Sequence, residues 1–196
     1  MVNHMIDRLL YCLISERSIR QEDSDIYRFG LECMILKVVH YISYVLIGFL
    51  MHSLTGLLIS TCTLAPLRSR TGGYHAKSRI GCYFFSCFFV FLICLFNKST
   101  IPGWIHFSGL FLADIIIYFW TPVENENNPL DSTEKQIFHK QAVSFLCIAN
   151  FFVLVMLWQN MKAGSYLLNG IVMEAVLLLL GKYKIWVTGL KRIKVH

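Results

Sequence analysis

The stretch IGCYFFSCFFVFLICLF, residues 80–96, contains no charged side chain and is apolar or aromatic along almost its whole length. Such a run predicts a helix that crosses a membrane. Five similar stretches occur, at residues 33–51, 53–67, 104–120, 142–158 and 165–180. We therefore expect an all-α membrane protein with about six transmembrane helices, paired by short connections into three hairpins. A span needs about 20 residues, so 53–67 is the least secure of the six.

The composition of the chain supports a membrane location. Hydrophobic residues make up 56% of the chain and charged residues only 15%. A soluble domain has closer to a quarter of its residues charged, so an apolar phase must cover this surface. The seven cysteines lie mostly in apolar stretches, where cysteine behaves as a small hydrophobe, and none has metal-ligand spacing. We expect one integral membrane domain over residues 1–196, without a cofactor or a metal.

Residues 1–18 show a different, amphipathic pattern. Their apolar residues recur at helical spacing, at Ile6, Leu9, Leu10, Leu13 and Ile14. Basic residues nearby favour a helix on an anionic membrane surface, while packing on the protein's own cytosolic face is the alternative. We assign residues 1–30 to this cytosolic-face segment, 33–180 to the six spans and 181–196 to a basic cytosolic tail.

The basic residues predict the orientation of the chain. With six spans and both termini in the cytosol, fifteen of the eighteen Lys and Arg residues fall on the cytosolic side. The outer turns hold only Lys98 and Lys162, and Lys37 lies in the first span. The positive-inside rule favours this orientation over its inverse. We therefore expect a multi-pass protein of a cell membrane that contacts lipid and has no nucleic-acid partner.

The segment between the second and third spans has the residues for chemistry. It reads RSRTGGYHAKSRIGC, residues 68–82, and places His75 seven positions before Cys82. Histidine can deprotonate a cysteine that then attacks as the thiolate. On one continuous helix the two residues would be about 10 Å apart, so a fold-back at Gly72 and Gly73 is needed, with a helix starting near Arg79. The alternative is an interfacial packing thiol and a loop histidine.

This segment resembles the signature of the accessory gene regulator B (AgrB) family of bacterial membrane cysteine endopeptidases. The family pattern has an arginine seven positions before the histidine, a glycine two before it and a cysteine seven after it. Arg68, Gly73, His75 and Cys82 match all four positions. TPVENENNPL, residues 121–130, is similar to the family's segment after the fourth span, and FGLE, residues 29–32, is a weaker similarity.

The resemblance implies a specific reaction. Such enzymes remove the acidic C-terminal tail of a quorum-sensing precursor peptide and keep the remainder as a thioester on the catalytic cysteine. A Cys or Ser of the precursor then attacks the thioester and closes a cyclic thiolactone or lactone. His75 would be the base and Cys82 the nucleophile. The supporting or substrate-binding residues would be Arg68, Arg70, Gly72, Gly73 and Lys77.

Other readings of the sequence stay open. The rival function is a non-enzymatic transporter or a peptide-export subunit, in which a buried carboxylate lines a pathway. Glu32, Asp114 and Glu174 lie in or beside spans, and we expect Asp114 to be the most buried of the three. Any of the three could orient His75, and pairing with Lys37 or simple protonation is the alternative. Gly56 and Gly109 are expected to mark close helix packing. The oligomeric state, with a homodimer among the alternatives, is not determined by the sequence.

Overall fold

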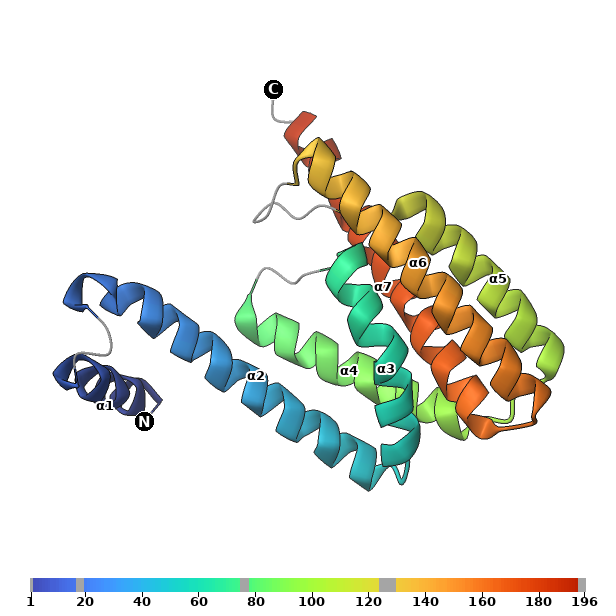
Figure 1. Cartoon of the computed structure of the whole chain (residues 1–196), viewed down its shortest axis with the longest axis horizontal. Helices are drawn as coiled ribbons and strands as arrows, with labels where there is room; N and C mark the ends of the chain where they lie inside the picture. Colours follow the sequence, from blue (N-terminus) through green and yellow to red (C-terminus); the bar gives the residue numbers. More distant parts are fainter. Residues whose placement is uncertain (1, 17–19, 75–77, 124–129, 194–196) are drawn as a thin grey trace. The chain divides into compact units, whose positions relative to one another are not determined.

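The computed structural model describes residues 2–16, 20–74, 78–123 and 130–193. The helices, in chain order, are α1 (Val2–Ser15), a 3₁₀ turn η1 (Gln21–Asp23), α2 (Ser24–Leu50), α3 (Leu54–Thr71), α4 (Arg79–Lys98), α5 (Gly103–Trp120), α6 (Ser132–Trp158) and α7 (Lys162–Ile193) (Figure 1). Over these residues β-pairing is limited to one isolated bridge between Gly72 and Val123. The expected all-α class is confirmed.

Within the described ranges, five helical stretches are long and apolar enough to cross a membrane: Gln21–Leu50, Arg79–Lys98, Gly103–Trp120, Ser132–Trp158 and Lys162–Val187. Helix α3 forms where the second span was expected, but it is not among these five. Its buried stripe is partly polar and includes Ser60, Thr63 and Thr71, which lowers its apolar content. The protein therefore fits a multi-pass membrane protein, and the complete six-span arrangement stays a prediction.

The chain forms two compact units, residues 1–46 and 47–196. In the first unit, α1 buries Ile6 and Leu10, one helical turn apart, while Asp7 and Arg8 are exposed. Arg28 of α2 forms ion pairs with Asp7 at 3.0 Å and with Glu32 at 3.9 Å. Residues Val2–Ser15 are thus helical, and an amphipathic helix on the membrane surface stays a prediction.

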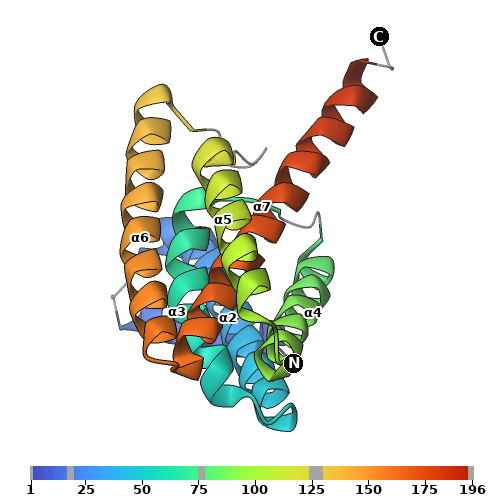
Figure 2. The same ribbon diagram turned by 90° about the vertical axis from the view of Figure 1, so that its right-hand side faces the viewer.

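Helix α7 is the central helix of the second unit. It packs against α3, α4, α5 and α6 (Figure 2). A helix that is apolar on nearly all sides is buried by its neighbours. In the most apolar stretch of α7, 56% of the residues are buried. The core cluster brings together residues from α3, α5, α6 and α7, namely Leu67, Leu110, Ala113, Ile117, Leu146, Ala149, Val153, Leu168, Ile171 and Ala175.

Helices α3 and α7 approach closely at Gly170. A Cβ there would lie 2.2 Å from Thr63 Oγ1 and 2.3 Å from Ser60 O. The hydroxyls of Ser60 and Thr63 donate to the carbonyls of Tyr166 and Leu167 at 2.8 Å each. Small residues and hydroxyl-to-carbonyl hydrogen bonds are how membrane helices pack tightly.

Two glycines were expected to mark such close packing. At Gly56 a Cβ would lie 3.0 Å from Asn97 Nδ2, in agreement with that expectation. At Gly109 the nearest atom would be 3.9 Å away, so the expectation is wrong there. The position on α5 has ordinary packing space, whereas Gly170 of α7 has no room for a Cβ beside α3.

The α3–α4 connection and the α5–α6 connection begin at the same end of the second unit. Val123, after α5, donates its N–H to Thr71 O, at the end of α3, at 2.7 Å. Asp131 and Glu134 then form a capping box that starts α6. Helix α7 continues past this end of the unit to Ile193, through most of the segment expected to be a basic tail.

Candidate active site

The chain reverses direction after α3 through two glycines. Gly72 has a φ of +72° and Gly73 a φ of +121°, values that glycine adopts far more readily than other residues. An added Cβ would lie 2.3 Å from Val123 O at Gly72 and 2.1 Å from Arg68 Nη1 at Gly73. The expected glycine turn is confirmed, and neither position has room for a side chain. Residues 72–74 are called the Gly72–Tyr74 turn below.

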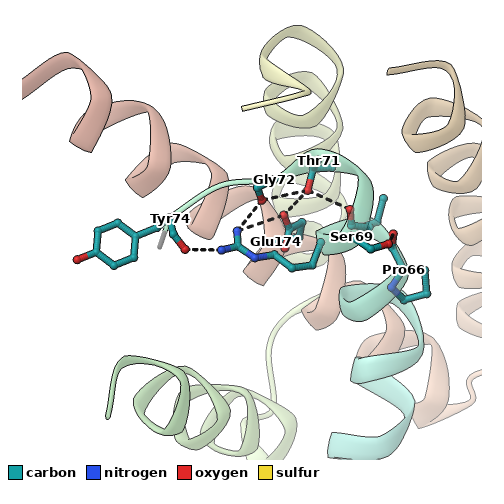
Figure 3. Close-up of polar contacts among 8 residues, drawn as sticks. Pro66, Ser69, Thr71, Gly72, Tyr74 and Glu174 are labelled. Atoms are coloured by element: carbon teal, nitrogen blue, oxygen red, sulfur yellow. Dashed lines mark hydrogen bonds and ion pairs between the residues drawn. The ribbon is translucent and has the colours of Figure 1, made fainter. Parts of the chain in front are cut away.

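Arg68, in the last turns of α3, holds the Gly72–Tyr74 turn in place. Its Nη1 donates to Gly72 O at 2.6 Å, and its Nη2 donates to Tyr74 O (Figure 3). One planar guanidinium therefore binds the two carbonyls on either side of Gly73. A side chain at Gly73 would collide with that guanidinium. The sequence pointed to Arg68 and Gly73 as supporting residues; in the structure Arg68 clamps the backbone on either side of Gly73.

Helix α7 supports the same turn from one of its faces. Glu174 Oε1 accepts a hydrogen bond from Thr71 Oγ1 at 2.5 Å and lies 3.8 Å from Arg68 Nη1 (Figure 3). Tyr74 N–H donates to Leu177 O at 3.2 Å. At Gly181 a Cβ would lie 2.6 Å from the carbonyl carbon of Gly73.

Sequence reasoning missed Leu177 and Gly181, and it named Glu174 only as one of three carboxylates that could orient His75. Glu174, Leu177 and Gly181 are spaced i, i+3 and i+7, which places them on one side of a helix. A carboxylate and a glycine at this spacing in an apolar helix were the sequence signal for a special face of α7. The sequence does not show which segment packs against that face.

Cys82 lies at the beginning of α4. The helix starts at Arg79, as expected, and Ser78 caps it by accepting a hydrogen bond from Gly81 N–H at 3.0 Å. Cys82 N–H donates to Ser78 O at 2.9 Å, which is the first backbone bond of the helix. The Cys82 side chain is partly exposed.

Tyr74 connects the turn to the helix that carries Cys82. Its ring packs on the Phe85 ring with centroids 4.4 Å apart. Phe85 follows Cys82 by three residues, less than one helical turn. On α7, Lys184 Nζ lies over the Tyr74 ring, 5.4 Å from its centroid. The residue directly before His75 in the sequence is therefore held between α4 and α7.

The remaining residues predicted for the site have different outcomes. His75 and Lys77 lie outside the described residues. Arg70 is partly buried; its Nη1 donates to Pro66 O at 2.8 Å, and its guanidinium lies 5.9 Å from the Phe145 ring centroid. Within the described ranges, no group of three or more His, Cys, Asp or Glu side chains could hold a metal ion.

Asp114 is not the most buried acidic residue, so that expectation is wrong. Glu174 is fully buried, whereas Asp114 is only partly buried and accepts a hydrogen bond from Asn150 Nδ2 at 2.9 Å. The reason is the position of the helices: α7 has neighbours on most sides, whereas much of α5 faces outward.

These features define an α-helical protein of the multi-pass membrane class, with a clamped glycine turn leading toward a cysteine at a helix N-terminus. The accessory gene regulator B (AgrB) family profile matches residues 6–179 of the 196-residue chain, so the protein belongs to the AgrB family. This membership is consistent with a part in processing the pheromone of accessory gene regulator quorum sensing. No curated protein and no solved structure matches the chain.

Proposed function

We propose that this protein is a membrane-embedded cysteine endopeptidase that cuts a quorum-sensing precursor peptide and cyclises it. Cys82 is the nucleophile and His75 is its base. The observation that carries the assignment is the contact of Tyr74 with Phe85, because it brings the residue preceding His75 against α4 within one turn of Cys82. Without the glycine turn, seven residues of helix would separate the pair by about 10 Å.

The reaction has two acyl transfers. His75 takes the proton of the Cys82 thiol, and the sulfur attacks the carbonyl carbon before the precursor's tail. The C–N bond breaks, the tail leaves as an amine that receives the proton from His75, and a C–S thioester remains. A Cys or Ser side chain of the precursor then attacks the thioester and forms the ring, and the Cys82 sulfur regains a proton. The thioester keeps acyl reactivity, so ring closure needs no ATP if water is excluded.

The charge of the chain suits the proposed substrate. The formal net charge is +6 at pH 7, and basic residues flank the site at Arg68, Arg70, Lys77 and Arg79. Such a surface attracts an acidic peptide tail. We place the site and both termini on the cytoplasmic side of a bacterial cell membrane, where a membrane-bound amphipathic precursor meets the N-terminal helix. The full site includes Gly72 and Gly73, and a homodimer is compatible with it.

The test is co-expression of the full chain with a precursor, followed by mass spectrometry of the peptides. We expect Cys82→Ala and His75→Ala to abolish tail release while membrane insertion stays normal. Cys87→Ala is the matched control, because Cys87 is also partly exposed and lies on α4 five residues further on. Wild-type cleavage by Cys82→Ala, or loss of cleavage by Cys87→Ala alone, would refute the assignment. Export of an uncut precursor would instead favour the transporter reading.

A further inference from the structure

The buried carboxylate of Glu174 on α7 is unexpected in the core of a membrane protein. Its side chain has 0% exposure, whereas the side chain of its ionic partner Arg68 is 23% exposed. Among the described residues, Oε2 accepts no hydrogen bond. A buried ionisable group costs folding free energy unless it is paired, and in membrane spans such groups are usually functional.

Among the described residues, the polar contacts of Glu174 lead to the Gly72–Tyr74 turn. Thr71 Oγ1, one residue before the turn, donates to Oε1 at 2.5 Å (Figure 3). The same oxygen lies 3.8 Å from Arg68 Nη1, the atom that donates to Gly72 O at 2.6 Å. Glu174 therefore orients the residue before the turn and the guanidinium that clamps it.

We propose that Glu174 is a positioning residue for the peptidase reaction: it fixes the Arg68 guanidinium, and through it the backbone that leads to the catalytic histidine. This inference rests on the proposed function. Glu174 acts through Arg68 and does not touch the reacting atoms. Its effect should therefore appear in the rate of the chemical step more than in substrate binding.

The first experiment compares Glu174→Leu with Asn169→Leu in the purified full chain in lipid nanodiscs. Asn169 is the matched control because it is also a buried polar residue of α7, but it bonds to Asn97 at 2.9 Å, away from the turn. Displacing a catalytic group by about 1 Å can cost about 100-fold in rate, so we expect Glu174→Leu to lower kcat by about that factor and to change KM by less than about threefold. Asn169→Leu should keep kcat near the wild-type value.

Two further variants separate positioning from general packing. Glu174→Gln keeps an oxygen for the Thr71 hydroxyl and loses the charge facing Arg68, so it should recover part of the kcat that Glu174→Leu loses. In an Arg68→Met background, Glu174→Leu should cause little further loss, because the residue that it acts through is gone. The double variant also tests folding, since replacing both members of a buried ion pair by apolar residues is often neutral.

Hydrogen exchange of the Tyr74 amide provides a measurement that does not depend on catalysis. This amide is bonded to Leu177 O and should exchange slowly in the wild type, faster in Glu174→Leu, and at the wild-type rate in Asn169→Leu. Unchanged exchange and kcat in Glu174→Leu would overturn the proposal. So would an equal kcat loss in Asn169→Leu, or full additivity with Arg68→Met. If the wild type cuts no precursor, the proposed function fails, and exchange alone then decides whether Glu174 anchors the turn.

Discussion

Gly181→Ala adds a single methyl group at the point where α7 passes under the Gly72–Tyr74 turn. The new Cβ would lie 2.6 Å from the carbonyl carbon of Gly73 and 2.8 Å from Tyr74 N. Carbon atoms in contact prefer about 3.5 Å, so the turn must move by about 1 Å. These neighbours are backbone atoms and cannot avoid the methyl by changing rotamer.

The displacement should affect both stability and catalysis. The Tyr74 N–H to Leu177 O hydrogen bond is already 3.2 Å long, and a shift of about 1 Å away from α7 would break it. Overpacking of this kind costs about 1–3 kcal/mol of folding free energy. A catalytic group misplaced by about 1 Å loses about 100-fold in rate, which is the fall in kcat that we expect.

The assay measures initial rates of tail release from a synthetic precursor by the full chain in nanodiscs. Gly109→Ala is the matched control, since a Cβ there would lie no closer than 3.9 Å to Val172. It should retain the wild-type rate and the wild-type thermal midpoint. A Gly181→Ala variant that is folded and as fast as Gly109→Ala would refute the view that α7 sets the position of the turn.

Two other predictions follow from the contacts and the charge pattern. Arg68→Lys should lose at least about tenfold in kcat, because one ammonium cannot reproduce the two-nitrogen contact with the carbonyls of Gly72 and Tyr74; Arg70→Lys is the control and should lose little, and equal rates for the two variants would contradict the clamp. Single cysteines at positions 135 and 162 of a cysteine-free chain should label from the cytosol and from the outside respectively, and the reverse pattern would overturn the orientation on which the site assignment depends.

Much of the fold could be predicted because its signals are local. A largely apolar stretch of about 16 to 19 residues indicates a span whatever the neighbouring helices are. Among the described residues, five helices are long and apolar enough to cross a membrane. The pair Gly72-Gly73 predicts a turn of the chain, because glycine has no Cβ and adopts positive φ whatever its neighbours are. The start of α4 near Arg79 was also predicted from the sequence, which placed Cys82 in its first turn.

The tertiary structure decided what surrounds the candidate site. The sequence contains Glu174 and Gly181 but does not show that their face of α7 meets the end of α3 and the following turn. That register depends on the close approach of the two helices at Gly170, where Ser60 and Thr63 pack against α7. A contact between residues about 100 positions apart depends on which helices become neighbours and on how they are rotated, and a single helix's pattern carries no information about either.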